Sequence, residues 1–149
     1  MNVISIDESS WNKVMNKDKS WSIIGQPHKI REDRGGRIIT LLAATSCFGV
    51  EAFMIIEGSV NSAIWCYFIA QVQKKVFPRL KSKVQGLDER EILLLYDNCS
   101  SHTGKIAGWW MRNLRCVKMT TVPYTPEFNP VERLFNTLKW KSSDGVMRN

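Results

Sequence analysis

The sequence has few of the features that mark secreted, membrane-spanning or zinc-binding proteins. Its 149 residues include only four cysteines, which are scattered and form no CxxC pair or cysteine–histidine cluster. This spacing argues against a structural zinc site and favours reduced thiols. No apolar run approaches the length of a membrane span, and no secretory leader pattern opens the chain. We therefore expect an intracellular protein that does not enter a membrane, nuclear in a eukaryote and cytoplasmic or nucleoid-associated in a bacterium.

Acidic residues are also scarce relative to basic ones. The chain has 14 Asp and Glu against 21 Lys and Arg, a formal net charge of +7 and a pI near 9.4. This balance favours a polyanionic partner, with nucleic acid as the first candidate. Several cations gather around a Gly-Gly turn and others flank the motifs described below. The residues expected to contact DNA phosphates are Lys29, Arg31, Arg34, Arg37, Lys105 and Arg133.

The hydrophobic pattern predicts a mixed sheet covered by helices. Short aliphatic and β-branched runs predict strands over residues 3–6, 21–24, 37–48, 50–56, 91–96 and 116–121. Apolar residues at three- and four-residue steps predict helices over 61–80, 103–113 and 129–140, with Pro78 ending or kinking the first. The early strands read as an antiparallel meander, and the later strand–helix–strand order implies a parallel pair. We expect one α/β domain over residues 1–149.

Acidic side chains stand at the ends of three separate elements. Asp7 follows the first strand, Asp97 ends the buried run before it, and Glu132 lies in the first turn of the last helix. An acid at the carboxyl end of a central strand faces the crevice where α/β proteins bind ligands. Carboxylates converging from three elements are what a divalent-metal site for phosphodiester chemistry requires.

Each acid also has a purely structural interpretation. Asp7 could form an Asx-turn, and Asp97 could cap the helix that follows it. Asn129 could be the N-cap of the last helix, with Pro130 at its first position and Glu132 completing a capping box. The two interpretations of Glu132 differ in geometry. A capping carboxylate bends back to Asn129, whereas a metal ligand points across to the other two acids.

Other polar and aromatic residues nearby have simpler explanations than catalysis. We interpret His102 as a helix-start histidine that orders its loop by hydrogen bonding. Cys99 lies too near it in sequence to resemble the usual Cys–His catalytic pair. Gly104-Lys105 lacks the glycine and the hydroxyl residue of a phosphate-binding loop. The tryptophans Trp65, Trp109 and Trp110 are expected in the core rather than as base-stacking platforms.

Two sequence strings carry a family resemblance. Tyr96-Asp97-Asn98, followed by His102, leads to the string Pro-Tyr-Thr-Pro-Glu-Phe-Asn-Pro-Val-Glu over 123–132. With the 34 residues between Asp97 and Glu132, this resembles the Tc1/mariner and IS630 group of DDE transposases. Asp7-Glu8-Ser9 resembles the first acidic motif of that group, so that the resemblance covers nearly the whole chain.

The resemblance implies an RNase H-like fold with Asp7, Asp97 and Glu132 as catalytic acids and metal ligands. Members of the group cut transposon ends and join them to target DNA with Mg²⁺ or Mn²⁺, and two ions are expected here. The partners implied are transposon-end and target DNA, with a possible homodimer. Members place helix-turn-helix DNA-binding modules before the catalytic domain. Nothing here resembles such a module, so we expect a catalytic domain without it.

Two other functions are compatible with the same residues. The chain could be a truncated, inactive or co-opted DNA-binding relic of a transposase, because no end-recognition module is recognisable. It could also be a general RNase H-like nuclease, which would prefer RNA–DNA hybrids to duplex DNA. Metal binding and substrate preference separate these possibilities from strand transfer.

Overall fold

Five strands form one mixed sheet in the computed structural model, which describes residues 2–12, 38–122 and 129–143. The strand order is β3-β2-β1-β4-β5. The strands are β1 (Asn2–Asn12), β2 (Ile38–Ser46), β3 (Gly49–Glu57), β4 (Ile92–Tyr96) and β5 (Val117–Thr120). The β1–β2 and β2–β3 pairs are antiparallel, whereas β1–β4 and β4–β5 are parallel. The predicted mixed sheet is confirmed, and the strand predicted over 21–24 lies outside the described residues.

The first strand is longer than the sequence suggested. Its polar half has low β propensity, yet it continues through Asp7 to Asn12 because residues 5–12 pair with β2. Only Asn2 to Ser5 pair with β4. The interpretation of Asp7 as a turn residue after a strand is therefore wrong, since Asp7 lies inside the strand.

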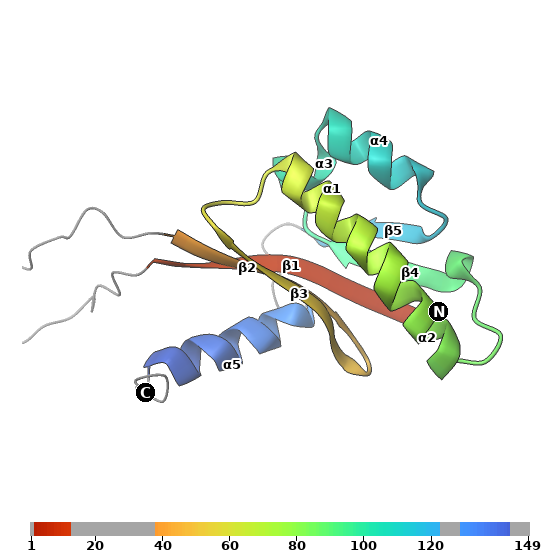
Figure 1. Ribbon diagram of the computed structural model, residues 1–149, viewed down its shortest axis with the longest axis horizontal. Coiled ribbons are helices and arrows are strands. Elements are labelled where there is room, and N and C mark those ends of the chain that lie inside the picture. Colours follow the sequence, from red (N-terminus) through yellow and green to blue (C-terminus); the bar gives the residue numbers. More distant parts are fainter. Residues whose placement is uncertain (1, 13–37, 123–128, 144–149) are drawn as a thin grey trace, which may run out of the picture.

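One long helical segment crosses a face of the sheet (Figure 1). It consists of α1 (Ser62–Gln71), the π-helical turn η1 (Val72–Val76) and α2 (Phe77–Lys83), and the Asn61 side chain caps its start. The helix predicted over 61–80 is confirmed and continues to Lys83, so that Pro78, expected to end or kink it, does not end it. The wide turn lets the Phe77 N–H donate to the Val72 carbonyl, and Pro78 then stands in the first turn of α2, where a missing N–H costs little.

Helices cover both faces of the sheet, with β1 at its centre (Figure 1). Trp65, Phe68 and neighbouring residues of α1–η1–α2 pack on Ile4 and Ile6 of β1, together with Ala107 of α4 (Lys105–Asn113). On the opposite face, Val131 and Phe135 of α5 (Val131–Ser143) pack with Ala43. Successive side chains of a strand point to opposite faces, so β1 presents its even-numbered residues to α1 and its odd-numbered residues to α5.

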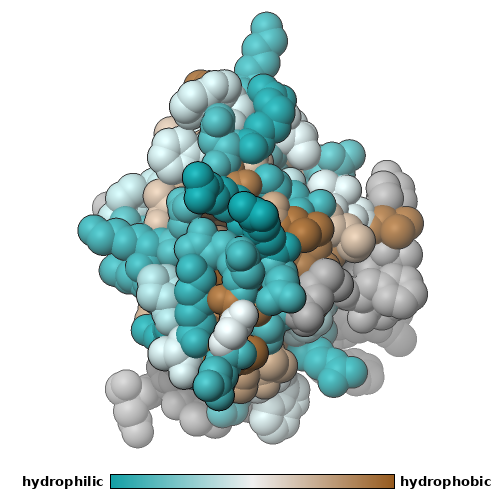
Figure 2. Space-filling view, turned by 90° about the vertical axis from the view of Figure 1, so that its right-hand side faces the viewer, coloured by the Kyte–Doolittle hydropathy of each residue, from teal (hydrophilic) through white to brown (hydrophobic). Residues whose placement is uncertain are grey.

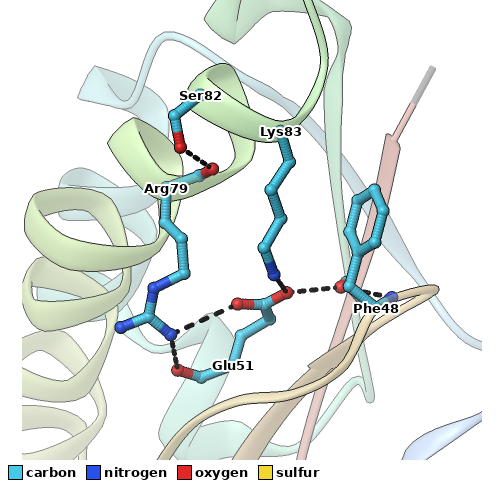
Figure 3. Close-up of polar contacts among 6 residues, drawn as sticks. Phe48, Glu51, Arg79, Ser82 and Lys83 are labelled. Carbon is cyan, nitrogen blue, oxygen red and sulfur yellow. Dashed lines mark hydrogen bonds and ion pairs between the residues drawn. The ribbon is translucent and has the colours of Figure 1, made fainter.

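A buried acid ties the β2–β3 hairpin to α2. The Glu51 side chain is only 2% exposed, and its carboxylate lies 3.5 Å from Arg79 Nη1 and 3.4 Å from Lys83 Nζ (Figure 3). Ser46 Oγ donates to the same carboxylate at 2.8 Å. These bonds hold the hairpin against the basic end of the helix. Figure 2 faces this end of the molecule and shows a largely hydrophilic surface with smaller hydrophobic areas.

Two exclusions made from the sequence concern thiols and membranes. All four cysteines are free, in agreement with the absence of any disulfide pattern. Among the described residues, no helix is both long and apolar enough to cross a membrane.

Candidate catalytic site

Two of the predicted acids stand level with each other on neighbouring strands. The parallel register pairs Asn2 with Ile92 and continues to Ser5 with Leu95. The same register carried two residues further places Asp7 beside Asp97, just past the end of β4. On the other side of β1, Asp7 pairs with Ala43, which is buried under Val131 and Phe135 of α5. The two acids therefore meet at one edge of the paired strands.

Asp7 is an acid held among hydrogen bonds and negative charges. Its Oδ1 accepts the Glu8 N–H at 2.8 Å, and its Oδ2 accepts Asn129 Nδ2 at 2.8 Å. Burial raises the pKa of Asp7 to about 7, and the charges of Asp97, Glu8 and Glu132 add to this rise against the lowering effect of the Glu8 amide. A nearby cation would stabilise the ionised form of a carboxyl group in this setting and would take the place of its proton.

The third acid is placed by the start of α5. Glu132 lies partly exposed in the first turn of the helix, and its charge contributes to the raised pKa of Asp7. Asn129 is buried, and both ends of its amide face β1, because Oδ1 accepts Ser5 Oγ while Nδ2 donates to Asp7. The N-cap role proposed for the Asn129 side chain is thus replaced by a bond to the central strand.

Asp97 has a different electrostatic environment from Asp7. Its Oδ1 accepts the Cys99 N–H at 3.2 Å and lies 2.5 Å from His102 Nδ1. The hydrogen bond with His102 is the main reason that the pKa of Asp97 is lowered, although burial opposes it. Near pH 7, where Asp7 is about half protonated, Asp97 is therefore ionised. Two neighbouring acids with separated pKa values are typical of functional sites.

His102 lies beneath this edge of the sheet, inside the short helix α3 (Ser100–Thr103). Its side chain has no exposed surface, and its Nε2 lies 3.0 Å from Glu8 Oε2. The ring stacks on Trp65 with centroids 3.7 Å apart. Burial lowers the pKa of His102, but the hydrogen bonds to Asp97 and Glu8 outweigh it and raise the pKa to about 10. The ordering role inferred for His102 agrees with these contacts.

Sequence reasoning missed the part that Glu8 plays. Glu8 directly follows Asp7, so the alternation of side chains along β1 sends the two carboxylates to opposite faces. The adjacent Asp7 and Glu8 would have indicated carboxylates on opposite faces of the sheet if the predicted strand had continued through both residues. The predicted strand ended before them.

The acids fit a divalent cation by their chemistry, since carboxylate oxygens are the ligands that Mg²⁺ and Mn²⁺ prefer. Asp7 is linked by charge to both Asp97 and Glu132. Within residues 2–12, 38–122 and 129–143, no three or more His, Cys, Asp or Glu side chains are gathered closely enough to form a metal site. Their roles as ligands stay a prediction.

The predicted DNA-contacting residues are only partly within the described chain. Lys29, Arg31, Arg34 and Arg37 lie outside the described residues, whereas Lys105 on α4 and Arg133 on α5 are exposed. Of the tryptophans, Trp65 is buried as predicted and Trp110 packs half-buried against the core. Trp109 is 58% exposed, so its assignment to the core was wrong. It stands on the outer side of the amphipathic helix α4.

A family model described as DDE superfamily endonuclease matches residues 2–146. The chain belongs to this family. No curated protein matches this sequence.

The chain is also similar to solved structures of Mos1 mariner transposase. A paired-end complex with Mn has a TM-score of 0.69 at 21% identity, covering 92% of this chain and 41% of that one. A paired-end complex with the left transposon end gives 0.67 and 21%, covering 91% and 40%. The Mos1 catalytic domain gives 0.65 and 15%, covering 92% and 58%. This chain thus spans less than two thirds of these relatives, and the likeness confirms the RNase H-like fold.

Proposed function

We propose that this chain is the catalytic domain of a mariner-type DDE transposase, which cleaves DNA phosphodiester bonds and transfers the resulting strand ends. The observation that carries the proposal is the position of Asp7 level with Asp97, with a pKa raised by burial and by the neighbouring acids. Glu132, at the start of α5, is the third member. The family match and the RNase H-like fold support the same reaction.

In this proposal Asp7, Asp97 and Glu132 hold Mg²⁺ or Mn²⁺, with two ions in the complete site. When bound, such ions supply an activated water or DNA 3′-hydroxyl and stabilise the leaving oxygen. The chain's own contribution is to place the acids. Asp7, on the central strand, lies level with Asp97 and its pKa is raised by the charge of Glu132, so these three residues would hold the ions together.

The DNA partner follows from charge. The net charge of +7 favours phosphate binding that weakens with salt and is largely independent of sequence. Lys105 and Arg133 are exposed on helices α4 and α5 and are available for such contacts. We include Lys29, Arg31, Arg34 and Arg37 in the proposed DNA-binding surface. We also propose that two copies of the chain pair on transposon ends, because the related Mos1 structures are described as paired-end complexes.

A nicking assay tests the proposal. Supercoiled plasmid incubated with the purified chain and Mn²⁺ is expected to give open circles, and Asp97→Asn is expected to abolish them. Asp88→Asn is the matched control, because Asp88 is an exposed carboxylate that caps the short 3₁₀ helix Glu89–Glu91 and retains a capping oxygen as Asn. Equal nicking by the Asp97 variant and the parent would refute the assignment.

The same preparation separates the two alternatives. Faster cleavage of RNA–DNA hybrids than of duplex DNA would indicate a general RNase H-like nuclease. Salt-dependent DNA binding without Mn²⁺ binding in calorimetry would indicate a DNA-binding relic. Joining of a 3′-hydroxyl end to target DNA, in addition to cleavage, is the outcome expected of a transposase.

A further inference from the structure

Glu8 lies next to a proposed catalytic acid but serves the other face of the sheet. Asp7 bonds to Asn129 on the α5 side of β1, whereas Glu8 reaches His102 on the α1 side. A carboxylate on the far face cannot join Asp7 and Glu132 around a common ion without reversing the strand. Glu8 therefore needs a role other than that of a ligand.

His102 connects Glu8 to Asp97 through its two ring nitrogens. Nδ1 lies 2.5 Å from Asp97 Oδ1, and Nε2 lies 3.0 Å from Glu8 Oε2. The ring is fully buried and is stacked on Trp65, so that its plane is fixed by packing as well as by the two carboxylates. A ring held at both nitrogens and on one face has little freedom to turn.

This contact divides the two oxygens of Asp97 between different tasks. Oδ1 lies 2.5 Å from His102 Nδ1 in an ion-pair contact and accepts the Cys99 N–H, and together these contacts restrict the direction of the carboxylate. Oδ2 is then the oxygen directed to other partners. Outer partners of this kind orient metal-binding side chains, and their loss commonly reduces metal affinity on the order of 10–100-fold.

We propose that Glu8 and His102 are positioning residues that hold the Asp97 carboxylate ready for a divalent cation. His102 orients Asp97, and Glu8 holds the far side of the His102 ring. The inference rests on the proposed function, because it assigns a purpose to the orientation of Asp97. It assigns a role to Glu8 and His102, which lie on the α1 side of the sheet and are not themselves proposed as metal ligands.

Two substitutions of His102 separate positioning from simple packing. His102→Asn places an amide N–H close to the position of Nδ1 and keeps a donor for Asp97. His102→Gln places its amide close to the position of Nε2 and keeps a donor for Glu8 but none for Asp97. Both variants lose the stacking on Trp65, so both are expected to lose similar thermal stability.

The first measurement needs no metal. Scalar couplings in the NMR spectrum report the χ1 angle of Asp97, which is expected to be single-valued in the parent and in His102→Asn and averaged in His102→Gln. An unchanged Asp97 χ1 in His102→Gln overturns the proposal whether or not the chain binds metal. A changed χ1 in a parent chain that fails to bind Mn²⁺ supports positioning and refutes the proposed function.

The second measurement is Mn²⁺ affinity by calorimetry. His102→Gln is expected to weaken it on the order of 10–100-fold, and His102→Asn much less. Equal losses in the two variants would reduce His102 to a packing residue. Glu8→Ala provides a second test, because it removes the partner of His102 Nε2 while keeping the ring and its stacking on Trp65. It is expected to loosen Asp97 and weaken Mn²⁺ binding, and an unchanged result in both readouts would remove Glu8 from the proposal.

Discussion

The side-chain amide of Asn129 joins the start of α5 to the middle of β1, since its Nδ2 donates to Asp7 Oδ2 at 2.8 Å. Its Oδ1 accepts from Ser5 Oγ, so two residues on the same face of β1 are bound at once. Glu132 follows three residues later on α5. The position of Glu132 relative to Asp7 therefore depends on one buried amide.

Replacing Asn129 should loosen that connection. Asn129→Ala leaves Ser5 Oγ and Asp7 without their partner in a buried place, and we expect a loss of about 1–3 kcal/mol in the free energy of unfolding, measured by urea denaturation. Asn136→Ala on the exposed side of the same helix is the control and should change stability little. Equal effects of the two substitutions would contradict the assigned role.

The raised pKa of Asp7 predicts how stability depends on pH. The carboxyl group titrates near pH 7 in the folded chain and near 3.8 when unfolded, so between these values only the folded state retains the proton. Stability in the metal-free chain should therefore fall as the pH rises from about 4 to about 7. Asp7→Asn should remove this part of the pH dependence and stabilise the chain at pH 7 by about 2 kcal/mol, roughly half of the full shift because the side chain is partly solvated.

A second group complicates the high end of that profile. The pKa of His102 is raised to about 10, so its contribution to stability is complete below pH 6.5 and is lost as the pH rises toward 10. The comparison of Asp7→Asn with the parent should therefore be read between pH 4 and pH 7. Thermal unfolding of Asp88→Asn provides the control, and an unchanged slope in Asp7→Asn would show that Asp7 is ionised normally.

The elements whose hydrophobic pattern is strong could be predicted from the sequence. The run ending at Tyr96 is apolar on both faces, and α5 carries a clear inner stripe, so Asp97 and Glu132 were placed on the correct elements. The second half of β1 could not be predicted in this way. Its Asp-Glu-Ser-Ser sequence is held in the sheet by pairing with β2, a contact between residues far apart in the chain.

The polar contacts around the site were also beyond prediction from sequence alone. Asn129 before a proline and three residues ahead of a glutamate has the local signature of a capping box, yet its Oδ1, the atom that would cap, accepts from Ser5 Oγ, and its Nδ2 donates to Asp7. Likewise Pro78 has the local signature of a helix end, and the wide turn of η1 removes the conflict. In both cases the local sequence predicted one outcome, and a nonlocal contact or an unusual backbone turn produced another.

The buried Glu51 predicts an asymmetry between the two sides of its ion pairs. Arg79 and Lys83 have side chains that are 52% and 37% exposed, so they can return to water when Glu51 is replaced. Glu51→Gln should therefore cost only about 1 kcal/mol, whereas Arg79→Met with Lys83→Met leaves a buried charge and should cost about 3 kcal/mol. Urea denaturation at pH 7 measures both, and a larger loss in Glu51→Gln would contradict this order.

The junction between α3 and α4 depends on the absence of a side chain at Gly104. A Cβ there would lie 2.9 Å from the Ser100 carbonyl oxygen, which already accepts the Gly104 N–H. Because that oxygen belongs to the backbone of α3, Gly104→Ala should displace the short helix that carries His102 and lower stability by about 1–3 kcal/mol. In a chain of this size, each kcal/mol corresponds to about 2–4 °C in thermal unfolding.

Gly108 offers a matched control one turn further along α4. A Cβ at that position would lie 3.3 Å from the Thr103 carbonyl oxygen, a tight contact but one that a small shift relieves. Alanine also gains about 0.5–1 kcal/mol over glycine inside a helix, so Gly108→Ala should be close to neutral. If Gly104→Ala displaces α3, it should also weaken Mn²⁺ binding through His102 and Asp97, whereas Gly108→Ala should leave it intact. Equal stability and equal Mn²⁺ affinity in the two variants would show that the α3–α4 junction does not support the site.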